Sequence, residues 1–392
     1  MLSGVHSGRK TMRDPRLDRL ADVIVGYSTK VKAGDLVAIR SDPIAMPLIE
    51  AVFERCLQAG AHPFWEATAD RLNEIYLEQA SDEQLAYLSP LQMQSIETVD
   101  VRIVFWAETN TKSMSRVDAS RQSKRSASRR PYMKRFMERA AAGELRWCGT
   151  LFPTPASAQD AEMSIRQYED FVFRAGLLHL DDPAAAWRKL AETQQRAVDW
   201  LNQKKLLHFR APAVAGHDGT DLRVSVDGAT WINCCGGENF PDGEVFAGPQ
   251  GVDGHVNYTF PAVYNGREVD GIRLEFKNGR VVDASARRNE EFLIAMLDQD
   301  EGARNLGEIA IGTNYSITQY TKNTLFDEKI GGTFHAAVGA GYPESGSTNE
   351  SGLHWDMVCD LRPEAGGGSI TADGEEFFRD GRFLFDGWPA PA

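Results

Sequence analysis

The hydrophobic pattern of this 392-residue chain changes near residue 190, and this change restricts the fold more than any other feature. Before it, apolar residues at helical spacing alternate with short, continuous apolar runs. After it, apolar and polar residues alternate one by one, as in strands with one buried face. We therefore predict an α/β N-terminal domain with a mainly parallel sheet, residues 1–190, and an α+β C-terminal domain with a largely antiparallel sheet that carries the functional site, residues 191–392.

The first half consists of helical and strand patterns in turn. Apolar residues recur at helical spacing over 17–25, and LVAIRS at 36–41 is typical of a short buried strand. A second helix is predicted over 46–59, and strands follow at 101–108 and 145–152. Helices and strands in alternation indicate a parallel sheet that is covered on both faces.

A long helix with a polar face, predicted over 183–205, leads into the second half. Apolar side chains alternate with polar ones over 222–226 and 272–276, which is typical of strands. The dipeptides Asn278-Gly279 and Asp380-Gly381 favour two-residue hairpin turns, because Asn, Asp and Gly tolerate positive φ. This half is therefore predicted to be mainly antiparallel.

The charge balance weighs against partners that carry phosphate. The chain has 43 Lys and Arg residues against 56 Asp and Glu residues, a formal net charge of −13. Nucleic acids and anionic membranes are bound mainly through Lys and Arg, so we expect neither as a partner. Eight basic residues lie between Arg121 and Arg139, and we interpret them as a solvated loop and helix that pairs with acidic residues of a partner subunit.

The sequence also indicates a cellular location. It has no run of about 18 apolar residues, and its first 20 residues lack the apolar core of a secretory signal. We expect a cytoplasmic protein whose cysteines are reduced, because they are too few and too scattered for a disulfide framework. These are Cys56, Cys148, Cys234, Cys235 and Cys359.

His354 and Asp356 in the segment HWDMV indicate a metal site. Side chains alternate between the two faces of a strand, so this pair projects from one face. There it is close enough to bind one ion or two neighbouring ions. For this pair alone, a buried histidine beside a solvated aspartate remains the alternative.

Glu328 and His335 lie on either side of a glycine pair in FDEKIGGTFHAAVG, residues 326–339. We expect Gly331-Gly332 to form a flexible turn, and His335 to begin a helix from which its side chain points into a cavity. The alternative for Glu328 is a charge at a helix N-terminus that interacts with the helix dipole.

Glu244 and Glu308 have apolar neighbours, in PDGEVFAGP and LGEIAIG. Such a carboxylate must be paired, protonated or metal-bound, because an unpaired buried charge costs several kcal/mol. A salt bridge to an arginine is the alternative for each. Together, the four carboxylates and two histidines supply suitable ligands for a pair of Zn, Co, Mn or Mg ions. Two ions that activate a shared water make a hydrolase site.

These segments resemble the aminopeptidase T / aminopeptidase S family, the dinuclear metalloaminopeptidases of the thermophilic type, over nearly the full chain. The segments that carry the resemblance occur in order: ADVIVGYSTKVKAGDLVAIRS, QAGAHPF, GARNLGEIAIGTN, NTLFDEKIGGTFHAAVGAGY and HWDMV. The resemblance implies a metal-dependent aminopeptidase that hydrolyses the N-terminal residue of short peptides. It also implies a homodimer whose active sites face a shared internal cavity, with a lid or dimerisation role for residues 1–190.

The resemblance further implies a role for each candidate residue. Glu308 is implied as a metal ligand that also serves as the base, and Tyr342 as a hydrogen-bond donor to the tetrahedral oxyanion. Two divalent ions, Zn, Co or Mn, are implied, with one carboxylate bridging them. Their implied ligands are Glu244, Glu308, Glu328, His335, His354 and Asp356.

Three other functions stay open. Some relatives of this scaffold resemble ring-cleaving dioxygenases for dihydroxypyridines, in which two histidines and one carboxylate hold a single Fe(II). His335, His354 and Asp356 would form that set, but the three glutamates of the predicted site have no role around one ferrous ion and favour the hydrolase. The others are a metal-dependent amidohydrolase that acts on a non-peptide amide and a catalytically silent metal-binding protein.

Overall fold

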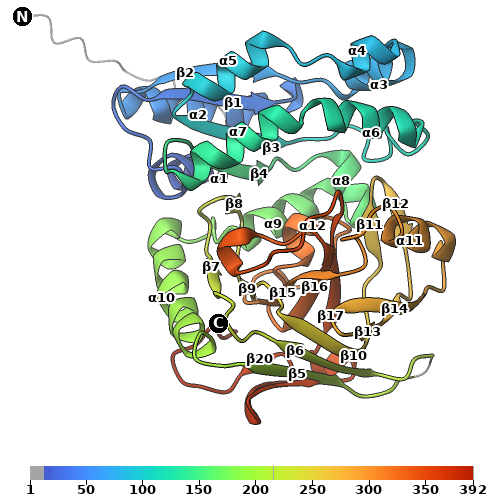
Figure 1. The fold of residues 1–392 in the computed structure, drawn as a ribbon. Helices are drawn as coiled ribbons and strands as arrows, with labels where there is room; N and C mark the ends of the chain where they lie inside the picture. The colour runs from blue at the N-terminus through green and yellow to red at the C-terminus, as the bar shows by residue number, and fades with distance from the viewer. Residues whose placement is uncertain (1–12, 215, 392) are drawn as a thin grey trace, which may run out of the picture.

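The computed structural model describes residues 13–214 and 216–391. The first 12 residues, part of the stretch in which no secretory signal was predicted, lie outside this range. Among the described residues, no helix combines the length and the apolar character needed to cross a membrane. Figure 1 shows the sheet of the first half, with most of the helices of that half, above the sheets of the second half.

The first half forms a parallel sheet, as predicted. Its strand order is β2-β1-β3-β4-β8, and every pair in it is parallel. Four strands come from the first half, whereas β8 comes from beyond residue 190. The strands are β1 (Leu36–Ser41), β2 (His62–Ala67), β3 (Val101–Trp106), β4 (Arg146–Leu151) and β8 (Asn239–Phe240).

Helices cover both faces of this sheet. The helices of this half are α1 (Pro15–Asp22), α2 (Met46–Gln58), α3 (Asp70–Gln79), α4 (Asp82–Ala86), α5 (Pro90–Thr98), α6 (Ala119–Ser128), α7 (Arg130–Ala141), α8 (Pro155–Asp160) and α9 (Ile165–Ala175). Val37 and Ile39 of β1 pack into one core cluster with α1 and α2. Ala38, on the opposite face of β1, packs with Ile96 of α5 and Tyr132 of α7. This alternation is that of a strand buried on both sides.

The basic segment lies on α6 and α7 and pairs within its own chain. Lys124 Nζ lies 2.7 Å from Asp82 Oδ2, and Arg135 Nε lies 2.8 Å from Glu97 Oε2. These ion pairs neutralise part of the positive charge that we expected to pair with acidic residues of a partner subunit. That expected pairing stays a prediction.

The second half contains two large antiparallel sheets, as predicted. The eight-stranded sheet has the order β14-β13-β10-β6-β5-β18-β19-β20, and the five-stranded sheet has the order β17-β16-β15-β9-β7. The strands of the larger sheet are β5 (Leu206–Ala211), β6 (Thr220–Ser225), β10 (Gly251–Asn257), β13 (Arg273–Lys277), β14 (Arg280–Ser285), β18 (Ser369–Ala372), β19 (Glu375–Arg379) and β20 (Arg382–Phe383). Those of the smaller sheet are β7 (Ile232–Cys234), β9 (Glu244–Ala247), β15 (Leu306–Gly312), β16 (Thr333–Gly339) and β17 (His354–Asp360).

These two sheets pack face to face around one core. Phe334 of β16 lies against Phe209 of β5, with ring centroids 4.5 Å apart. Ile309 and Ile311 of β15 belong to the same buried cluster as Val224 of β6. Alternate side chains of both sheets therefore interdigitate, as in a β-sandwich. A short hairpin and two short α-helices also lie in this half: β11 (Ala262–Tyr264), β12 (Arg267–Val269), α11 (Glu290–Leu297) and α12 (Thr324–Asp327).

The two predicted hairpin turns are confirmed. Asn278 and Gly279 join β13 to β14, and Asp380 and Gly381 join β19 to β20, all four at positive φ. The helix predicted to begin at His335 is wrong, because this segment is strand β16. Its alanines have little intrinsic preference for a strand, so the pairing with β15 and β17 decides the conformation.

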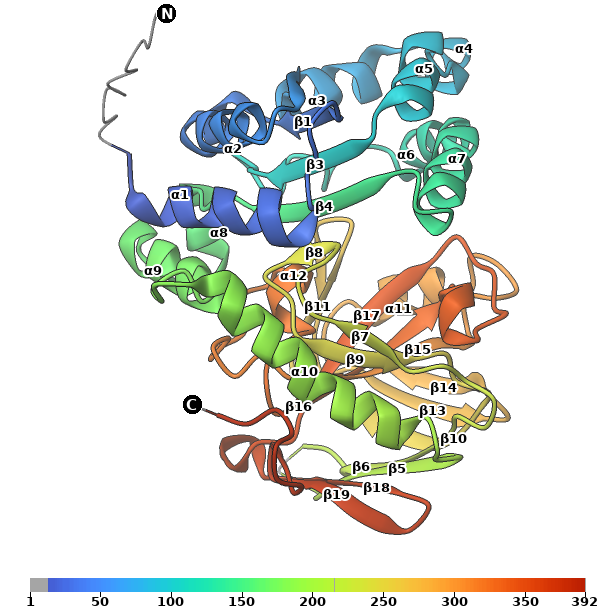
Figure 2. The ribbon, with the colours of Figure 1, turned by 90° about the vertical axis from the view of Figure 1, so that its left-hand side faces the viewer.

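The boundary predicted near residue 190 falls inside a helix, α10 (Pro183–Leu201). Figure 2 shows α10 running beside β7 and β9. Side chains of the second half also enter the core of the first, where Phe326 of α12 packs edge-on against Phe171 of α9 at 5.3 Å. The division into two domains stays a prediction, and the two halves share buried contacts.

Candidate metal centre

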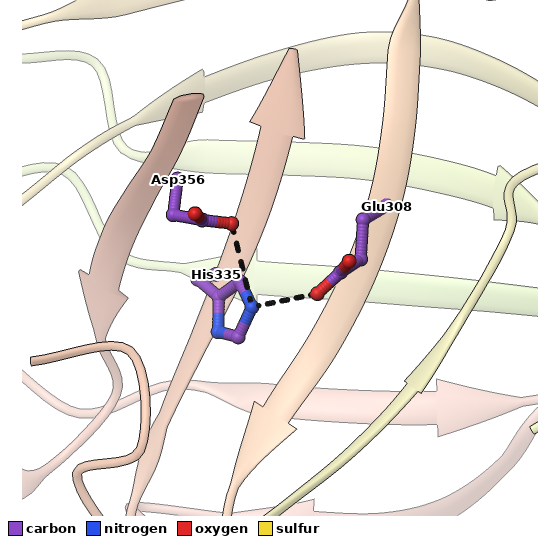
Figure 3. Close-up of side chains that lie close together, drawn as sticks. All are labelled: Glu308, His335 and Asp356. Carbon is purple, nitrogen blue, oxygen red and sulfur yellow. Dashed lines mark hydrogen bonds and ion pairs between the residues drawn. The ribbon is translucent and has the colours of Figure 1, made fainter. Parts of the chain in front are cut away.

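Three neighbouring strands of the five-stranded antiparallel sheet carry the candidate site on one face. Glu308 lies on β15, His335 on β16 and Asp356 on β17, and Figure 3 shows their side chains turned toward one another. Their cross-strand neighbours are small, since Glu308 pairs with Ala337 and His335 with Ala310. The opposite face of these strands packs into the sandwich core. Strand alternation therefore separates a core face from a face that holds the polar groups.

The Nε2 atom of His335 lies at the centre of the site. Glu308 Oε1 lies 3.0 Å from it, Glu244 Oε2 3.6 Å and Asp356 Oδ1 3.8 Å. One ligand atom each of Glu308, His335 and Asp356 lies within 4.8 Å of the other two, close enough for all three to hold one metal ion. Only 1% of His335 and 4% of Glu308 is exposed. Charges buried this deeply require a partner of opposite charge.

Main-chain oxygens orient both histidines. His335 Nδ1 lies 3.0 Å from the carbonyl oxygen of Glu328, and His354 Nδ1 lies 2.7 Å from that of Ala340. A carbonyl oxygen can only accept a hydrogen bond, so each Nδ1 carries a hydrogen and donates it. Nε2 of each ring is then the atom available to a metal, and fixing the ring in this way is typical of metal-binding histidines.

Two buried carboxylate oxygens in this site have no hydrogen-bond partner among the described residues. They are Glu244 Oε2 and Asp356 Oδ1, which lie 3.6 and 3.8 Å from His335 Nε2. Since buried polar atoms are nearly always satisfied, each of these oxygens needs a hydrogen-bond donor or a cation. Carboxylate oxygens with imidazole nitrogens suit Zn, Co and Mn. The site therefore fits a divalent ion.

His354 reaches the site through Asp356, as the spacing in HWDMV predicts. Both lie on β17, and His354 Nε2 is 3.5 Å from Asp356 Oδ2. Asp356 therefore turns one carboxylate oxygen toward His335 and the other toward His354.

Glu328 reaches the site from the residue that follows α12. It is the C-cap of that helix, so the alternative of a charge at a helix N-terminus is wrong. Its carboxylate pairs with Lys329, and Lys329 Nζ also lies 3.5 Å from Glu244 Oε1. Within the described part of the chain, no arginine pairs with Glu244 or Glu308, so the proposed arginine salt bridges are absent there.

Lys329 is the residue of this site that sequence reasoning missed. Its side chain is 0% exposed, which is rare for a lysine. The available signal was its position directly after Glu328, because a lysine next to a candidate ligand is within reach of the same ion pairs. The structure thus brings ligand atoms of Glu308, His335 and Asp356 within 4.8 Å of one another. Glu244 lies beside His335, His354 lies beside Asp356, and Glu328 is joined to Glu244 through the buried Lys329.

The electrostatics of the metal-free site favour protonated histidines. Burial acts to lower the pKa of His335, but the hydrogen bond to Glu308 and the charges of Glu244 and Asp356 raise it to about 10. Burial likewise acts to raise the pKa of Asp356, but His354, His335 and Lys329 hold it well below its usual value. A metal ion must therefore displace protons from the imidazoles when it binds.

Tyr342 lies beside the site in the loop after β16. Its ring packs edge-on against Phe246 of β9 at 5.6 Å and against His354 at 5.4 Å, and 37% of the residue is exposed. Partial burial and the charge of Glu308 raise the pKa of its hydroxyl well above the usual value. The hydroxyl is therefore a hydrogen-bond donor at neutral pH. Its catalytic role stays a prediction.

Comparison with known proteins agrees with a metallopeptidase. Residues 13–383 match the model of the family described as thermophilic metalloprotease (M29). Aminopeptidase 2 of Geobacillus stearothermophilus is 29% identical, in an alignment that covers 95% of this chain and 98% of the relative. Aminopeptidase AmpS of Bacillus subtilis is 33% identical over 63% of this chain and 64% of its own length.

A solved structure has the same fold. Wild-type AmpT from Thermus thermophilus superposes with a TM-score of 0.81 at 24% identity, covering 95% of this chain and 99% of that one. The combination of a parallel sheet in the first half and antiparallel sheets in the second is therefore shared by the two proteins.

Proposed function

Because the chain belongs to the thermophilic metalloprotease family (M29), we propose that it is an aminopeptidase that removes the N-terminal residue from short peptides. As a member of this family it is a metal-dependent peptidase. One observation supports the location of the active site: ligand atoms of Glu308, His335 and Asp356 converge at a buried point toward which an unpartnered oxygen of Glu244 is also turned.

The proposal includes two divalent ions, Zn, Co or Mn. One would be held by Glu308, His335 and Asp356 with Glu244, and the other by His354 and Glu328 with the second oxygen of Asp356. This assignment is supported by the orientation of Asp356, whose two oxygens face different histidines. When bound, two such ions activate water and polarise the scissile carbonyl.

Two side chains of the protein would carry out the remaining steps of the hydrolysis. Glu308 would accept the proton that water loses, a role that the resemblance implies and that is supported by its position where the candidate ligand atoms converge. The Tyr342 hydroxyl donates a hydrogen bond to the carbonyl oxygen as negative charge develops there. Its raised pKa supports this role, since the hydroxyl keeps its hydrogen at neutral pH.

The assembly and location that we propose follow the resemblance described above. The protein would be a cytoplasmic homodimer in which residues 1–190 form the lid or the dimer contact, so that only short peptides reach the two sites. All five cysteines are free thiols, which fits a reducing compartment. Light scattering tests the assembly, and a monomer would count against it.

The dioxygenase alternative has less structural support than the peptidase. It needs two histidines and one carboxylate around one Fe(II). The group of ligand atoms that can hold one ion in the described residues contains a single histidine, His335, with Glu308 and Asp356. His354 is not part of that group.

A metal-dependence assay tests the proposed function. The protein is stripped of metal, supplied with zero, one or two equivalents of Zn, Co or Mn, and assayed for leucine release from Leu-Gly-Gly and from its N-acetylated form. We expect release from the free-amine peptide alone, and only with added metal. Release from neither peptide would overturn the proposal and favour an amidohydrolase that acts on a non-peptide amide.

A further inference from the structure

Lys329 divides the candidate ligands into two groups. Its ammonium pairs with Glu328 and lies 3.5 Å from Glu244 Oε1. The ligand atoms that already lie within 4.8 Å of one another belong to Glu308, His335 and Asp356, and Lys329 makes no ion pair with any of these three in the described structure. The carboxylates paired with Lys329 are therefore those outside the preformed group.

The main chain holds Lys329 firmly in this place. Its NH donates to the carbonyl of Phe326 at 3.1 Å, and its own carbonyl accepts from the NH of Asn314, also at 3.1 Å. The next residue, Ile330, is fully buried in the core of the first half. With its backbone fixed and its side chain sealed from water, separating the ammonium from a carboxylate partner is costly, because a buried charge without a partner is strongly unfavourable.

The net charge of the site shows how the ion pairs of Lys329 affect the binding of a metal ion. With neutral imidazoles, the carboxylates of Glu244, Glu308, Glu328 and Asp356 would leave a net charge of minus two after one divalent ion had bound. The ammonium of Lys329 reduces this to minus one. A second divalent ion is therefore attracted less strongly, and one of its ligands, Glu328, already holds a cation.

We propose that Lys329 is an internal competitor for the second divalent ion. The first ion binds to Glu308, His335 and Asp356 with Glu244, and the second, for which Glu328 is a ligand, binds only as the ammonium of Lys329 withdraws from Glu328. The two ions consequently bind one after the other, with clearly different affinities. This inference rests on the metal site of the proposed function, but it is independent of the substrate.

Calorimetric titration of the metal-free protein with Zn²⁺ tests the proposal. We expect the wild type to bind two ions whose dissociation constants differ by at least about tenfold. In Lys329→Met the second dissociation constant should fall by about tenfold or more, while the first changes less. An unchanged or weaker second ion in this variant would overturn the proposal and would mean that Lys329 positions the carboxylates for metal binding.

Lys204→Met is the matched control. Lys204 is also largely buried and also pairs with a carboxylate, that of Glu375 at 3.0 Å, but it makes no ion pair with any of the candidate ligands in the described structure. Its substitution removes the same charge and should leave both dissociation constants as in the wild type. An equal tightening in Lys204→Met would attribute the effect to net charge and overturn a specific role for Lys329.

A second variant at the same position is used if Lys329→Met does not fold. Lys329→Met leaves two carboxylates without a partner in the metal-free protein, so its apparent melting temperature should fall and should recover with Zn²⁺. If this variant does not fold without metal, Lys329→Gln replaces it with the same expectation, since the amide can still donate to a carboxylate. Two-step binding without peptide hydrolysis would overturn the proposed function alone, whereas hydrolysis with two ions of equal affinity would overturn this inference alone.

Discussion

The imidazole of His335 donates its Nδ1 hydrogen to the main-chain oxygen of Glu328, at 3.0 Å. One predicted ligand thus fixes the ring of another, and the segment between them, which contains two glycines, closes back on the site. The ring can neither rotate nor change tautomer without losing this bond. The orientation of the His335 ring is therefore fixed by a backbone atom as well as by neighbouring side chains.

His335→Gln should remove the first ion. The amide cannot replace Nε2 at the point where Glu308, Glu244 and Asp356 converge. We expect metal affinity to fall by more than the roughly 10- to 100-fold that is typical when a residue that only orients a ligand is lost. Metal content after dialysis, measured by plasma mass spectrometry, checks this. The control variant His255→Gln, with its substitution on β10 of the eight-stranded sheet, should retain as much metal as the wild type.

Tyr342→Phe should lower turnover by roughly 10² to 10³ without changing metal content, because it removes a donor to the developing oxyanion. Steady-state rates with Leu-Gly-Gly and metal analysis of the same sample check both parts. Tyr76→Phe on α3 provides the control. Turnover equal to that of the wild type would exclude the tyrosine from the mechanism.

Metal binding should release protons and tighten as the pH rises. The pKa of His335 and that of His354 are raised to about 10 by nearby carboxylates, so both rings hold an extra proton at pH 7 in the metal-free protein. An ion must displace these protons, and this cost shrinks as the pH approaches 10. Calorimetry at one pH in buffers of different ionisation enthalpy measures the released protons. Identical heats in all buffers would contradict the prediction.

Gly312→Ala should destabilise the protein and weaken the metal site together. A Cβ at Gly312, on β15, would lie 2.2 Å from the carbonyl oxygen of Ile330 and would push away the segment that carries Glu328 and Lys329. Crowding of this kind costs about 1–3 kcal/mol. Thermal unfolding and Zn²⁺ titration measure the two effects. Gly237→Ala, where a Cβ would meet open space, should change neither.

The parts of the fold that depend on local pattern could be predicted from the sequence. LVAIRS forms β1 at the predicted residues, and both hairpin turns form at dipeptides that tolerate positive φ. His354 and Asp356 share a strand face because the period of a strand is fixed by its geometry. Each of these predictions needs only residues that are neighbours in sequence.

The parts that depend on distant neighbours could not be predicted. Strand β16, which contains His335, exists because β15 and β17 pair with it, and its own residues are compatible with a helix. The ion pair of Lys329 with Glu244 likewise depends on β9, because Glu244 precedes Lys329 by 329 − 244 = 85 positions in the chain. Glu244 is therefore not visible in the local pattern around residue 329.

Strand β8 ends at Phe240 inside the sheet of the first half, and β9 begins at Glu244 inside the sheet that holds the metal centre. Only residues 241–243 connect them, and Phe240 is anchored in the core of the first half. If that sheet shifted relative to the two antiparallel sheets, Glu244 would be displaced with it, because the three-residue connection is too short to take up the movement. Opening the molecule and loosening an ion would then be one and the same movement.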